Sequence, residues 1–329
     1  MRVLITGGCG FLGSHLSDAF IERKDEVFAL DNGSTGKVRH LLTNPRFHYF
    51  CKSIFNLEAL DDLVARVDLV YHLAAVVGVK RCIAEPDKVL AVNAFGTQNV
   101  VKTACKYGKR VVFGSTSEVY GRNPKVPWKE DDDRVLGATT VDRWCYATSK
   151  ALGEHFCFAY RKRGLPVTVA RYFNAYGPRL DRIGAGRLLS IFEGQLLRGA
   201  DLTVMGDGKQ SRCFTYVSDT IEATVQAGLR PEAEGHVINI GSDVETSVLE
   251  LAELMLDLCG APRSRIRFIR HEEAYGKGYE EILRRVPDIT KMRTLLRVTP
   301  LVSLRDGLLR TFMWLRENNF GDLLGSLVG

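Results

Sequence analysis

A tyrosine and a lysine stand four residues apart in the stretch Tyr146-Ala-Thr-Ser-Lys150. On a helix, positions i and i+4 share one face, so the phenol and the ammonium group lie side by side. A neighbouring ammonium favours the phenolate, and we therefore expect the pKa of Tyr146 to fall below its usual value of about 10. Such a pair is a base that can take a proton from an alcohol near neutral pH. The spacing alone is common on helices, so its weight depends on the motifs that precede it.

A glycine-rich loop, Gly7-Gly-Cys-Gly-Phe-Leu-Gly13, follows a short apolar strand and opens a helix. Gly7 permits a tight turn, Gly10 lets the backbone approach a pyrophosphate, and Gly13 allows close packing of the helix. The N-terminus of that helix then faces the phosphates of a dinucleotide. A glycine turn that serves packing alone is the alternative, and the order of strand, loop and helix argues against it.

Asp31 ends the second predicted strand, where a carboxylate can accept hydrogen bonds from ribose hydroxyls. A carboxylate there repels a 2′-phosphate, so we expect NAD rather than NADP as the cofactor. The alternative for Asp31 is a cap at the end of the strand.

The elements that position these residues alternate between strand and helix. The predicted strands span 3–6, 27–30, 48–53, 69–75, 110–115 and 167–172, and the most prominent helices span 87–107 and 142–163. Such alternation predicts an α/β fold with a Rossmann-type, doubly wound parallel sheet.

After residue 174 the predicted elements become shorter. Helices are predicted over 187–198, 217–229, 247–258 and 302–316, and extended segments over 202–204 and 237–240. We therefore expect an NAD-binding domain over 1–174, to which the chain returns at about 214–243. Residues 175–329 should form mainly a smaller α/β domain that binds the substrate.

Composition narrows the class of partner. The net charge of +6 is spread over mixed acids and bases, which favours anionic small molecules and argues against nucleic acid. The eight cysteines show no metal-binding spacing, so we expect no metal site and a reducing, cytoplasmic location. No apolar run approaches the ~20 residues of a membrane span. The first strand begins at Arg2, so we expect no signal peptide.

Several motifs occur in a specific order along the chain. They are Thr6-Gly-Gly-Cys-Gly-Phe-Leu-Gly13, Asp31-Asn32, His72-Leu-Ala-Ala75, Asn93, Ser115-Thr-Ser-Glu-Val-Tyr-Gly121, Tyr146-x-x-x-Lys150 and Arg171-Tyr-Phe-Asn-Ala-Tyr-Gly-Pro-Arg179. As an ordered set they resemble the extended short-chain dehydrogenase/reductase family of NAD-dependent nucleotide-sugar epimerases and dehydratases. The resemblance runs from Arg2 to about Arg316.

The resemblance implies a set of residues that bind NAD. They are Gly7, Gly10, Phe11, Leu12, Asp31, Asn32, Ser34, Thr35, Gly36, Ser53, Ile54, Leu73, Ala74, Ala75, Asn93, Tyr146, Lys150 and Tyr172. One position departs from the family, because many relatives carry an aspartate that holds adenine where this chain has Ser53.

The family assigns Thr116, Tyr146 and Lys150 to catalysis as a unit. By resemblance, Tyr146 takes the proton of a sugar C4 hydroxyl as that carbon is oxidised by NAD. Lys150 lowers the pKa of the tyrosine and holds the nicotinamide ribose, and Thr116 hydrogen-bonds the same sugar hydroxyl. A strand-end hydroxyl and a solvated helix face are the alternatives.

Glu118 separates the subfamilies. Sugar 4,6-dehydratases carry Thr-Asp-Glu, whereas the string Thr116-Ser117-Glu118 resembles the UDP-glucuronate decarboxylases. Oxidation of C4 places a ketone β to the C6 carboxylate, and such an acid loses CO₂ readily. Glu118 is then a candidate to destabilise or orient that carboxylate, or, with a raised pKa, to supply the proton at C5. A structural hydrogen-bonding role is the alternative.

The resemblance also implies residues that bind a UDP-sugar: Ser117, Asn174, Arg187, Arg212 and Arg285. Arg212 matches an arginine that binds the diphosphate, for which a guanidinium is well suited. Arg285 belongs to a stretch, from Tyr275-Gly-Lys-Gly-Tyr279 onward, that resembles the decarboxylases. It could bind the substrate carboxylate or donate a proton through water, and it is thus a further catalytic candidate. A surface arginine paired with the Glu272-Glu273 region is the alternative.

Three functions remain open from the sequence. The first is NAD-dependent decarboxylation of UDP-glucuronate through a 4-keto intermediate to UDP-xylose. The second is a 4-epimerase of a UDP-hexose or UDP-glucuronate, because Arg171-Tyr-Phe-Asn is common in epimerases. The third is a catalytically silent NAD-binding scaffold. By resemblance, the helices at 87–107 and 142–163 form the interface of a homodimer, with Val89, Val92, Phe95, Val100 and Val101 as an apolar stripe.

Overall fold

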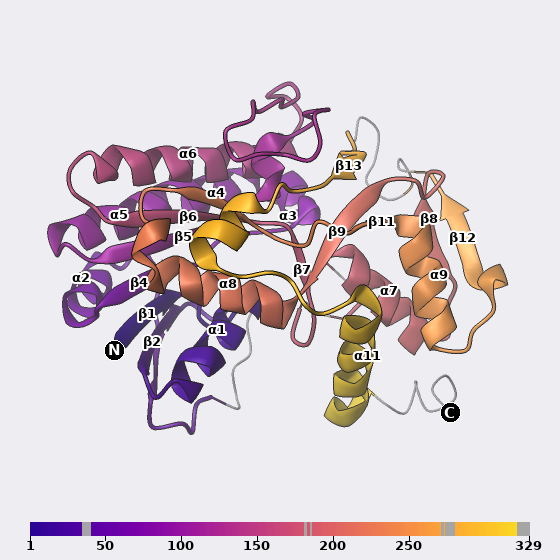
Figure 1. The fold of residues 1–329 in the computed structure, drawn as a ribbon, viewed down its shortest axis with the longest axis horizontal. Coiled ribbons are helices and arrows are strands. Elements are labelled where there is room, and N and C mark those ends of the chain that lie inside the picture. Colours follow the sequence, from indigo (N-terminus) through magenta and orange to yellow (C-terminus); the bar gives the residue numbers. More distant parts are fainter. Residues whose placement is uncertain (35–40, 181–182, 185, 271–272, 274–279, 321–329) are drawn as a thin grey trace.

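A parallel sheet of seven strands lies at the centre of the larger part of the molecule (Figure 1). The computed structural model describes residues 1–34, 41–180, 183–184, 186–270, 273 and 280–320. The sheet has the order β10-β6-β5-β4-β1-β2-β3. Its strands are β1 (Arg2–Thr6), β2 (Glu26–Asp31), β3 (Phe47–Cys51), β4 (Leu69–His72), β5 (Arg110–Thr116), β6 (Val167–Tyr172) and β10 (Val237–Ile240). The order reverses between β1 and β4, which opens a crevice at the carboxyl ends of the strands, where ligands bind in such sheets.

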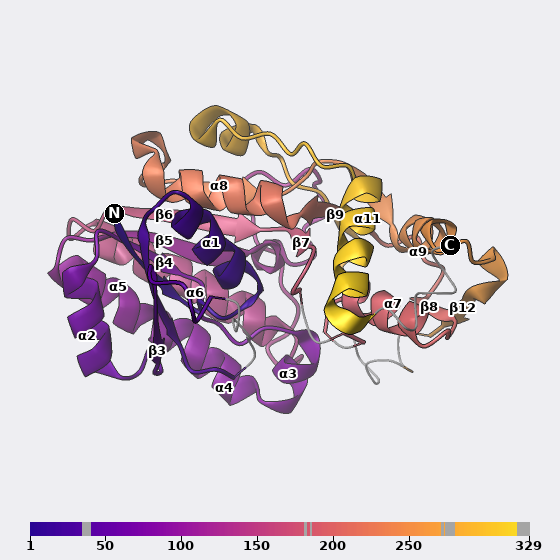
Figure 2. The same ribbon diagram turned by 90° about the horizontal axis from the view of Figure 1, so that it is seen from below.

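Helices cover both faces of this sheet (Figure 2). One face carries α1 (Phe11–Glu22) and α8 (Val217–Leu229), and the other carries α2 (Leu57–Arg66), α5 (Gly96–Lys106) and α6 (Trp144–Arg161). The short helices α3 (Val79–Ala84) and α4 (Pro86–Leu90) and the π-helical turn η1 (Ala91–Phe95) precede α5. Because helices cover both faces of the sheet, side chains on both sides of its strands are buried, and these strands are largely apolar. In β4, for example, every residue is buried. The predicted Rossmann-type α/β fold is confirmed.

The smaller part of the molecule is built on a second sheet. There β9 (Ser211–Tyr216) pairs with β11 (Glu245–Ser247), β13 (Arg284–Arg285) and β7 (Asn174–Tyr176). A separate pair joins β8 (Leu202–Met205) to β12 (Ile266–Ile269). The helices around them are α7 (Leu188–Leu197), α9 (Val248–Leu258) and α11 (Leu304–Leu315). Short helical turns complete the chain: η2 (Ser117–Tyr120), η3 (Pro231–Ala233), η4 (Arg263–Arg265), η5 (Met292–Leu296) and η6 (Arg316–Phe320).

The chain passes between the two parts more than once. Strand β9 of the small sheet runs directly into α8, which packs on the large sheet, and β10 then pairs with β6 at the edge of that sheet. The segment 214–243 therefore contributes to both parts, while the exact domain boundary stays a prediction. The predicted strand over 69–75 is too long, because β4 ends at His72 and the three residues after it turn toward the glycine loop.

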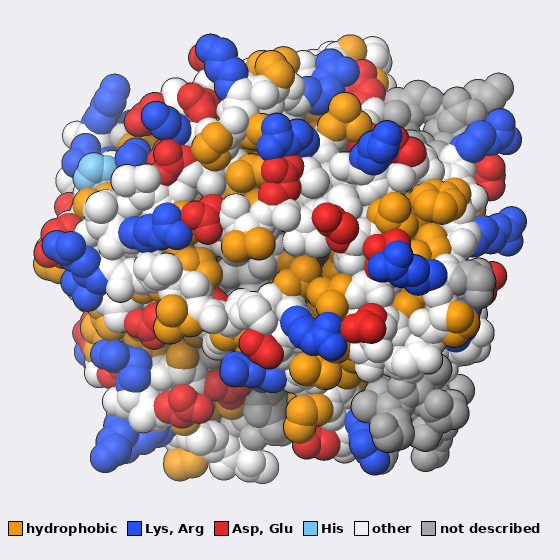
Figure 3. All heavy atoms as spheres, turned by 45° about the vertical axis from the view of Figure 1, so that its right-hand side comes forward, with side chains coloured by type: hydrophobic (Ala, Val, Ile, Leu, Met, Phe, Trp, Pro, Cys, Tyr) orange, Lys and Arg blue, Asp and Glu red, His pale blue; other side chains and the backbone are white. Residues whose placement is uncertain are grey.

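Acidic and basic side chains are interspersed over the surface that Figure 3 shows. This mixed pattern agrees with the prediction that the net positive charge favours small anionic ligands and does not form a continuous basic surface for nucleic acid. Among the described residues, no helix combines the length and the apolar character that crossing a bilayer requires.

Candidate active site

The glycine loop between β1 and α1 leaves no room for side chains at Gly7, Gly8 and Gly13. Gly7 has φ +74°, and a Cβ there would lie 2.7 Å from the amide nitrogen of Ala74. A Cβ at Gly13 would lie 2.1 Å from the Gly7 carbonyl oxygen, so the helix can approach the loop only with glycine there. A Cβ at Gly10 would meet one atom within 4 Å, the same Gly7 oxygen at 3.3 Å. The loop thus fits a pyrophosphate that approaches the backbone at Gly10.

Asp31 is held against this loop by two backbone amides. Cys9 N donates to one carboxylate oxygen of Asp31 at 3.0 Å, and Gly33 N donates to the other at 2.8 Å. Asn32 Oδ1 accepts from Ser34 N at 3.1 Å, which shapes the turn that follows β2. A fixed carboxylate beside the phosphate loop fits a ribose diol and repels a 2′-phosphate.

The remaining predicted cofactor residues frame the crevice on its other sides. The Leu73 amide donates to the Thr6 carbonyl at 3.0 Å, which places Leu73 to Ala75 beside the glycine loop. Ser53 Oγ accepts from Phe55 N at 3.2 Å, so its hydroxyl can offer a proton where relatives have a carboxylate acceptor. Ile54 is buried against the start of α5, where a Cβ at Gly96 would lie 2.3 Å from Ile54 Cδ1.

The side chains of two further predicted cofactor residues, Asn93 and Tyr172, also form hydrogen bonds within the protein. Asn93 accepts from Val76 N at 2.8 Å and donates to Val76 O at 3.0 Å, so its amide clamps the segment after β4. The Tyr172 hydroxyl lies 3.0 Å from Thr224 Oγ1 on α8. Phe11 and Leu12 open α1, while Thr35 and Gly36 lie outside the described residues.

The Tyr146–Lys150 pair corrects one expectation. The pKa of Tyr146 is raised to about 12, because desolvation outweighs the lowering effects of Arg187 and of a hydrogen bond with Thr116, and Glu118 adds to the rise. Lys150 is buried, and its Nζ donates to Gly114 O at 2.5 Å. Burial also lowers the pKa of Lys150 to about 8. The expectation that Lys150 draws the pKa of Tyr146 below 10 is therefore wrong, because desolvation of the phenol dominates and the Lys150 ammonium is directed to the backbone of β5.

Thr116 ends β5 and starts the turn that presents Glu118. Its Oγ1 accepts from Glu118 N at 3.2 Å, which caps η2 and fixes the direction of the glutamate. The preceding residue, Ser115, donates to Glu154 Oε1 at 2.5 Å, and Arg171 holds the same carboxylate through two bonds of 2.9 and 2.7 Å. This buried network braces the end of β5 from behind, while Ser117 is buried in the turn itself.

Glu118 faces two arginines. Its Oε1 lies 2.5 Å from Arg285 Nη1, and its Oε2 accepts from Arg143 Nη2 at 3.2 Å. Burial alone would raise the pKa of Glu118, but the charges of Arg285 and Arg143 overcome that effect, and the pKa is lowered. Glu118 is therefore a carboxylate here. The hypothesis that the pKa of Glu118 is raised, so that it serves as an acid, is therefore wrong.

Strand register brings the predicted substrate residues together in the small sheet. Arg285 is the register partner of Arg212, and Asn174 is the register partner of Phe214, two residues along β9 from Arg212. All three side chains therefore leave the same face of the sheet. Arg212 Nη2 donates to Glu281 Oε1 at 2.8 Å. Because Arg285 pairs with Glu118, the reading of Arg285 as a surface arginine near Glu272-Glu273 is wrong.

Arg187 lies where the two parts of the molecule meet. It precedes α7, its Cζ lies 5.8 Å from the centre of the Phe11 ring, and its charge lowers the pKa of Tyr146. An exposed guanidinium between the glycine loop and Tyr146 can meet an anionic ligand from either side.

Arg143 is the residue that the sequence reasoning missed. It is 4% exposed, stands directly before α6 and contacts the Glu118 carboxylate. A signal was present, since Arg143 precedes Tyr146 by three residues and so lies on the same side of the helix start.

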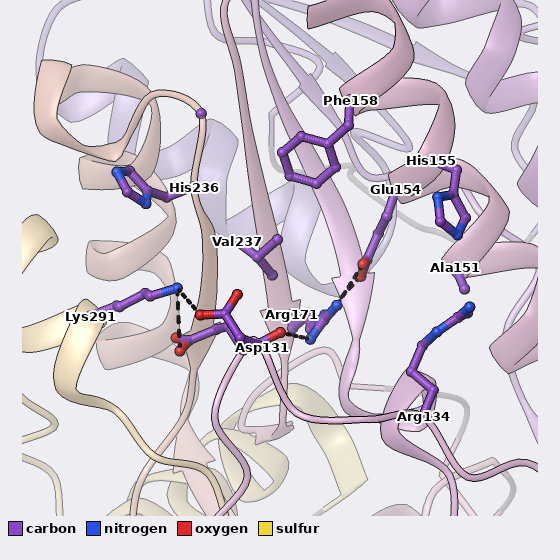
Figure 4. A pocket seen from close by; sticks show the side chains of 12 residues that line it. Asp131, Arg134, Ala151, Glu154, His155, Phe158, Arg171, His236, Val237 and Lys291 are labelled. Carbon is purple, nitrogen blue, oxygen red and sulfur yellow. Dashed lines mark hydrogen bonds and ion pairs between the residues drawn. The ribbon is translucent and has the colours of Figure 1, made fainter.

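A cavity of about 380 Å³ lies elsewhere, at the β10 edge of the large sheet. Figure 4 shows Glu154 directed to Arg171, and Lys291 directed to Asp131. No predicted site residue is among the described residues that line it. The buried charges that line this cavity are paired, Arg171 with Glu154 and Glu130 with Lys291. We therefore assign these residues a structural role in bracing β5 and β6.

Comparisons with known proteins identify the family and the fold. The family model described as NAD dependent epimerase/dehydratase family matches residues 3–241. The chain is 43% identical over 317 residues to UDP-N-acetyl-alpha-D-glucosaminuronate decarboxylase of Bacillus cytotoxicus, which covers 96% of this chain and 98% of that protein. It is 37% identical to UDP-glucuronic acid decarboxylase 1 of Danio rerio, over 95% of this chain and 72% of that protein. Among solved structures, UDP-glucuronic acid 4-epimerase of Bacillus cereus, in complex with UDP-glucuronic acid and NAD, superposes with a TM-score of 0.84 at 32% identity. That match covers 97% of this chain and 100% of the epimerase.

Proposed function

The chain belongs to the NAD dependent epimerase/dehydratase family, and from this premise we propose that it decarboxylates a UDP-hexuronate. UDP-glucuronate is the proposed substrate and UDP-xylose the product. The observation that carries the proposal is the ion pair between Glu118 and Arg285 at the end of β5. The two relatives named above support it, since both are named as decarboxylases of UDP-linked sugar acids. Their names differ in an N-acetyl group, so UDP-N-acetylglucosaminuronate is the substrate to compare first.

The first step is oxidation at C4. We assign acceptance of the C4 hydroxyl proton to the phenolate form of Tyr146, which is the minor form at neutral pH because its pKa is raised to about 12, and we place the Thr116 hydroxyl beside the same sugar oxygen. The chemistry that NAD supplies when bound is the reversible oxidation of this carbon. Lys150 Nζ donates one hydrogen bond to Gly114 O near the end of β5, and its other N–H groups can donate to a ribose hydroxyl of the cofactor.

The second step is loss of CO₂. Once C4 is a ketone, the C5–C6 bond breaks, CO₂ leaves, the electron pair of that bond moves into the ketone as an enolate, and C5 then takes a proton from solvent water. We assign the substrate carboxylate to Arg285, because Arg285 already binds a carboxylate, that of Glu118. Arg285 Nε has no hydrogen-bond partner among the described residues, which leaves a donor for a substrate oxygen. Reduction of the 4-keto pentose completes the proposed reaction.

A 4-epimerase is the second candidate. The epimerase of Bacillus cereus was solved with UDP-glucuronic acid, which has the same carboxylate, and its fold is very similar to that of this chain. An epimerase must keep the carboxylate on the sugar while the 4-keto group rotates to present its other face. A silent scaffold is disfavoured, because the chain keeps both Tyr146 and Lys150 in a braced site.

One assay separates these functions. The protein is incubated with NAD and either UDP-glucuronate or UDP-N-acetylglucosaminuronate, and both CO₂ and the nucleotide sugar are measured. Stoichiometric CO₂ with a UDP-pentose is the expected result. UDP-galacturonate without CO₂ would identify an epimerase, and NAD binding without turnover would identify a scaffold.

We also propose that the protein is a homodimer, as the family resemblance implies. Much of the predicted stripe is internal, since Val89, Val100 and Val101 are fully buried. Three apolar side chains on α4, η1 and α6 remain exposed and could meet a second copy: Leu90 at 40%, Phe95 at 56% and Leu152 at 39%. The division into a cofactor domain over 1–174 and a substrate domain over 175–329 remains a proposal, as does a cytoplasmic location.

A further inference from the structure

We propose that Arg143 is a positioning residue for decarboxylation: it orients the Glu118 carboxylate toward Arg285 and clamps the segment that carries Arg285 onto the start of α6. The inference rests on the proposed function, because it concerns the step in which CO₂ is lost.

Arg143 binds two partners that are remote from each other in sequence. Its Nη2 donates to Glu118 Oε2 at 3.2 Å, and its Nη1 donates to the Glu280 carbonyl oxygen. The guanidinium also lies over the Trp144 ring, with Cζ 4.9 Å from the ring centre. A planar guanidinium can make both bonds at once because its donors point in fixed, divergent directions.

The segment that begins at Glu280 is fixed at both ends. At its start, the Glu280 carboxylate accepts from Trp144 Nε1 at 2.7 Å and pairs with Arg122 Nη1 at 3.2 Å. At its end, Trp128 N donates to Val286 O at 2.8 Å. Between these anchors lies β13, which places Arg285 opposite Glu118. Arg143 is thus the one described side chain that binds both the start of this segment and Glu118.

The charges around Glu118 indicate what changes when substrate binds. Arg285 and Arg212 face it from the small sheet, Arg143 and Tyr146 from the region of α6, and Cys82 from α3. In the proposed reaction the substrate carboxylate takes Arg285. Arg143 then remains as the cation in contact with Glu118, which keeps Glu118 a carboxylate during the reaction.

The test compares Arg143→Gln with Arg122→Gln. Arg122 contacts the same glutamate and the same tryptophan ring as Arg143, but it is 42% exposed and pairs with the Glu280 carboxylate, not with Glu118. Arg122→Gln is therefore a matched control, because it shows the effect of losing a contact to Glu280 and Trp144 without losing a contact to Glu118. Each variant is assayed with UDP-glucuronate for CO₂ release in the steady state and, in a single turnover, for reduction of bound NAD. Binding of UDP and thermal unfolding are measured alongside.

Arg143→Gln should lower the rate of CO₂ release about 100-fold, as expected when a reacting group is misplaced by about 1 Å. Reduction of bound NAD in the single turnover should stay within about threefold of the wild type, because Tyr146 and Thr116 are untouched. The acidic limb of the pH profile for CO₂ release should move to higher pH, since removal of a cation makes Glu118 easier to protonate. Arg143→Lys should return the acidic limb to the pH of the wild type, because lysine supplies the charge, but it should not restore the full rate of CO₂ release.

Equal effects of the Gln variants at 143 and 122 would overturn the inference, as would a parallel loss of C4 oxidation and CO₂ release. An acidic limb that does not move in Arg143→Gln would also overturn it. A wild-type protein that releases no CO₂ would instead refute the proposed function, so the two failures are distinct.

Discussion

Arg212 and Arg285 are register partners on adjacent parallel strands, so two guanidinium groups leave the same face of the small sheet side by side. Each has its own carboxylate: Glu281 binds Arg212 at 2.8 Å, and Glu118 binds Arg285 at 2.5 Å. Two like charges this close are stable only with such counter-ions. A ligand with a diphosphate and a carboxylate carries anions that can replace both partners.

Glu118→Gln should lower CO₂ release about 10²–10⁴-fold, the usual range for loss of a group that takes part in proton transfer or charge placement. Affinity for NAD should change little, because no described contact joins Glu118 to the glycine loop or Asp31. Isothermal titration with NAD and a CO₂ assay check both points. Glu281→Gln, which removes the carboxylate from Arg212 instead, is the control, and an unchanged rate in Glu118→Gln would remove Glu118 from the mechanism.

Arg285→Met should weaken binding of UDP-glucuronate more than binding of UDP-glucose. A hydrogen bond to a charged group is worth about 1.5–3 kcal/mol, so the ratio of the two dissociation constants should change roughly 10- to 150-fold. Titrations in a Tyr146→Phe background, which cannot turn over, measure both constants. If the two sugars lose affinity equally, Arg285 contacts a part that they share and not the carboxylate.

Asp31→Asn should reduce discrimination between NAD and NADP. The wild-type carboxylate accepts from Cys9 N and Gly33 N, and its charge opposes a 2′-phosphate. The amide removes that charge, and we expect the ratio of NADP to NAD dissociation constants to fall at least about tenfold. Fluorescence titration with each dinucleotide gives the ratio. A ratio that stays constant would assign Asp31 to the turn alone.

His72 should make stability depend on pH. It is buried between Thr6 Oγ1 at 2.7 Å and Thr97 Oγ1 at 3.0 Å, and burial, with a contribution from Lys150, lowers its pKa to about 3. Below its unfolded pKa of about 6.5, the unfolded chain binds a proton that the folded chain does not, so stability falls as the pH drops from about 6.5 toward 3. The contribution is about 1.4 kcal/mol per pH unit in this window.

Urea unfolding at pH 7.5 and pH 5 checks this expectation. His72→Gln should be less stable than the wild type at pH 7.5, but it should lose less stability on acidification. A difference between the two proteins that is the same at both pH values would show that His72 is not the titrating group.

Phe95→Glu should shift the protein from dimer to monomer if the exposed residues on η1, α4 and α6 form the proposed interface. Phe95 is 56% exposed, so the change should leave the melting temperature of the monomer nearly unaffected. Light scattering after size exclusion measures the mass. Leu301→Glu, at a site 86% exposed and away from these helices, should leave the dimer intact.

The sequence predicted those parts of the site whose geometry depends on residues close together in the chain. The glycine spacing indicated the phosphate loop, and the alternation of strands and helices indicated the sheet whose carboxyl edge presents Asp31 and Thr116. The small strands β11 and β13 have three and two residues and no hydrophobic period, so the sequence offered no signal for them.

The charge states could not be predicted because they depend on distant contacts. Arg143 and Arg285 lie far along the chain from Glu118, and together they reverse the effect of burial on its pKa. The pKa of Tyr146 was misjudged for a related reason. The helical spacing places Lys150 nearby, but its ammonium donates a hydrogen bond to the Gly114 carbonyl, and desolvation of the phenol dominates.

Strand β13 consists of two residues and is attached to one edge of β9. The glycine loop, Tyr146 and Lys150 belong instead to the large sheet and its helices. The residue proposed to bind the substrate carboxylate therefore lies at the edge of the small sheet, in a segment anchored to the start of α6. The groups proposed for the oxidation and the group proposed for the loss of CO₂ thus come from different sheets, and a substitution near 280–286 can alter the second step without touching a residue proposed for the first.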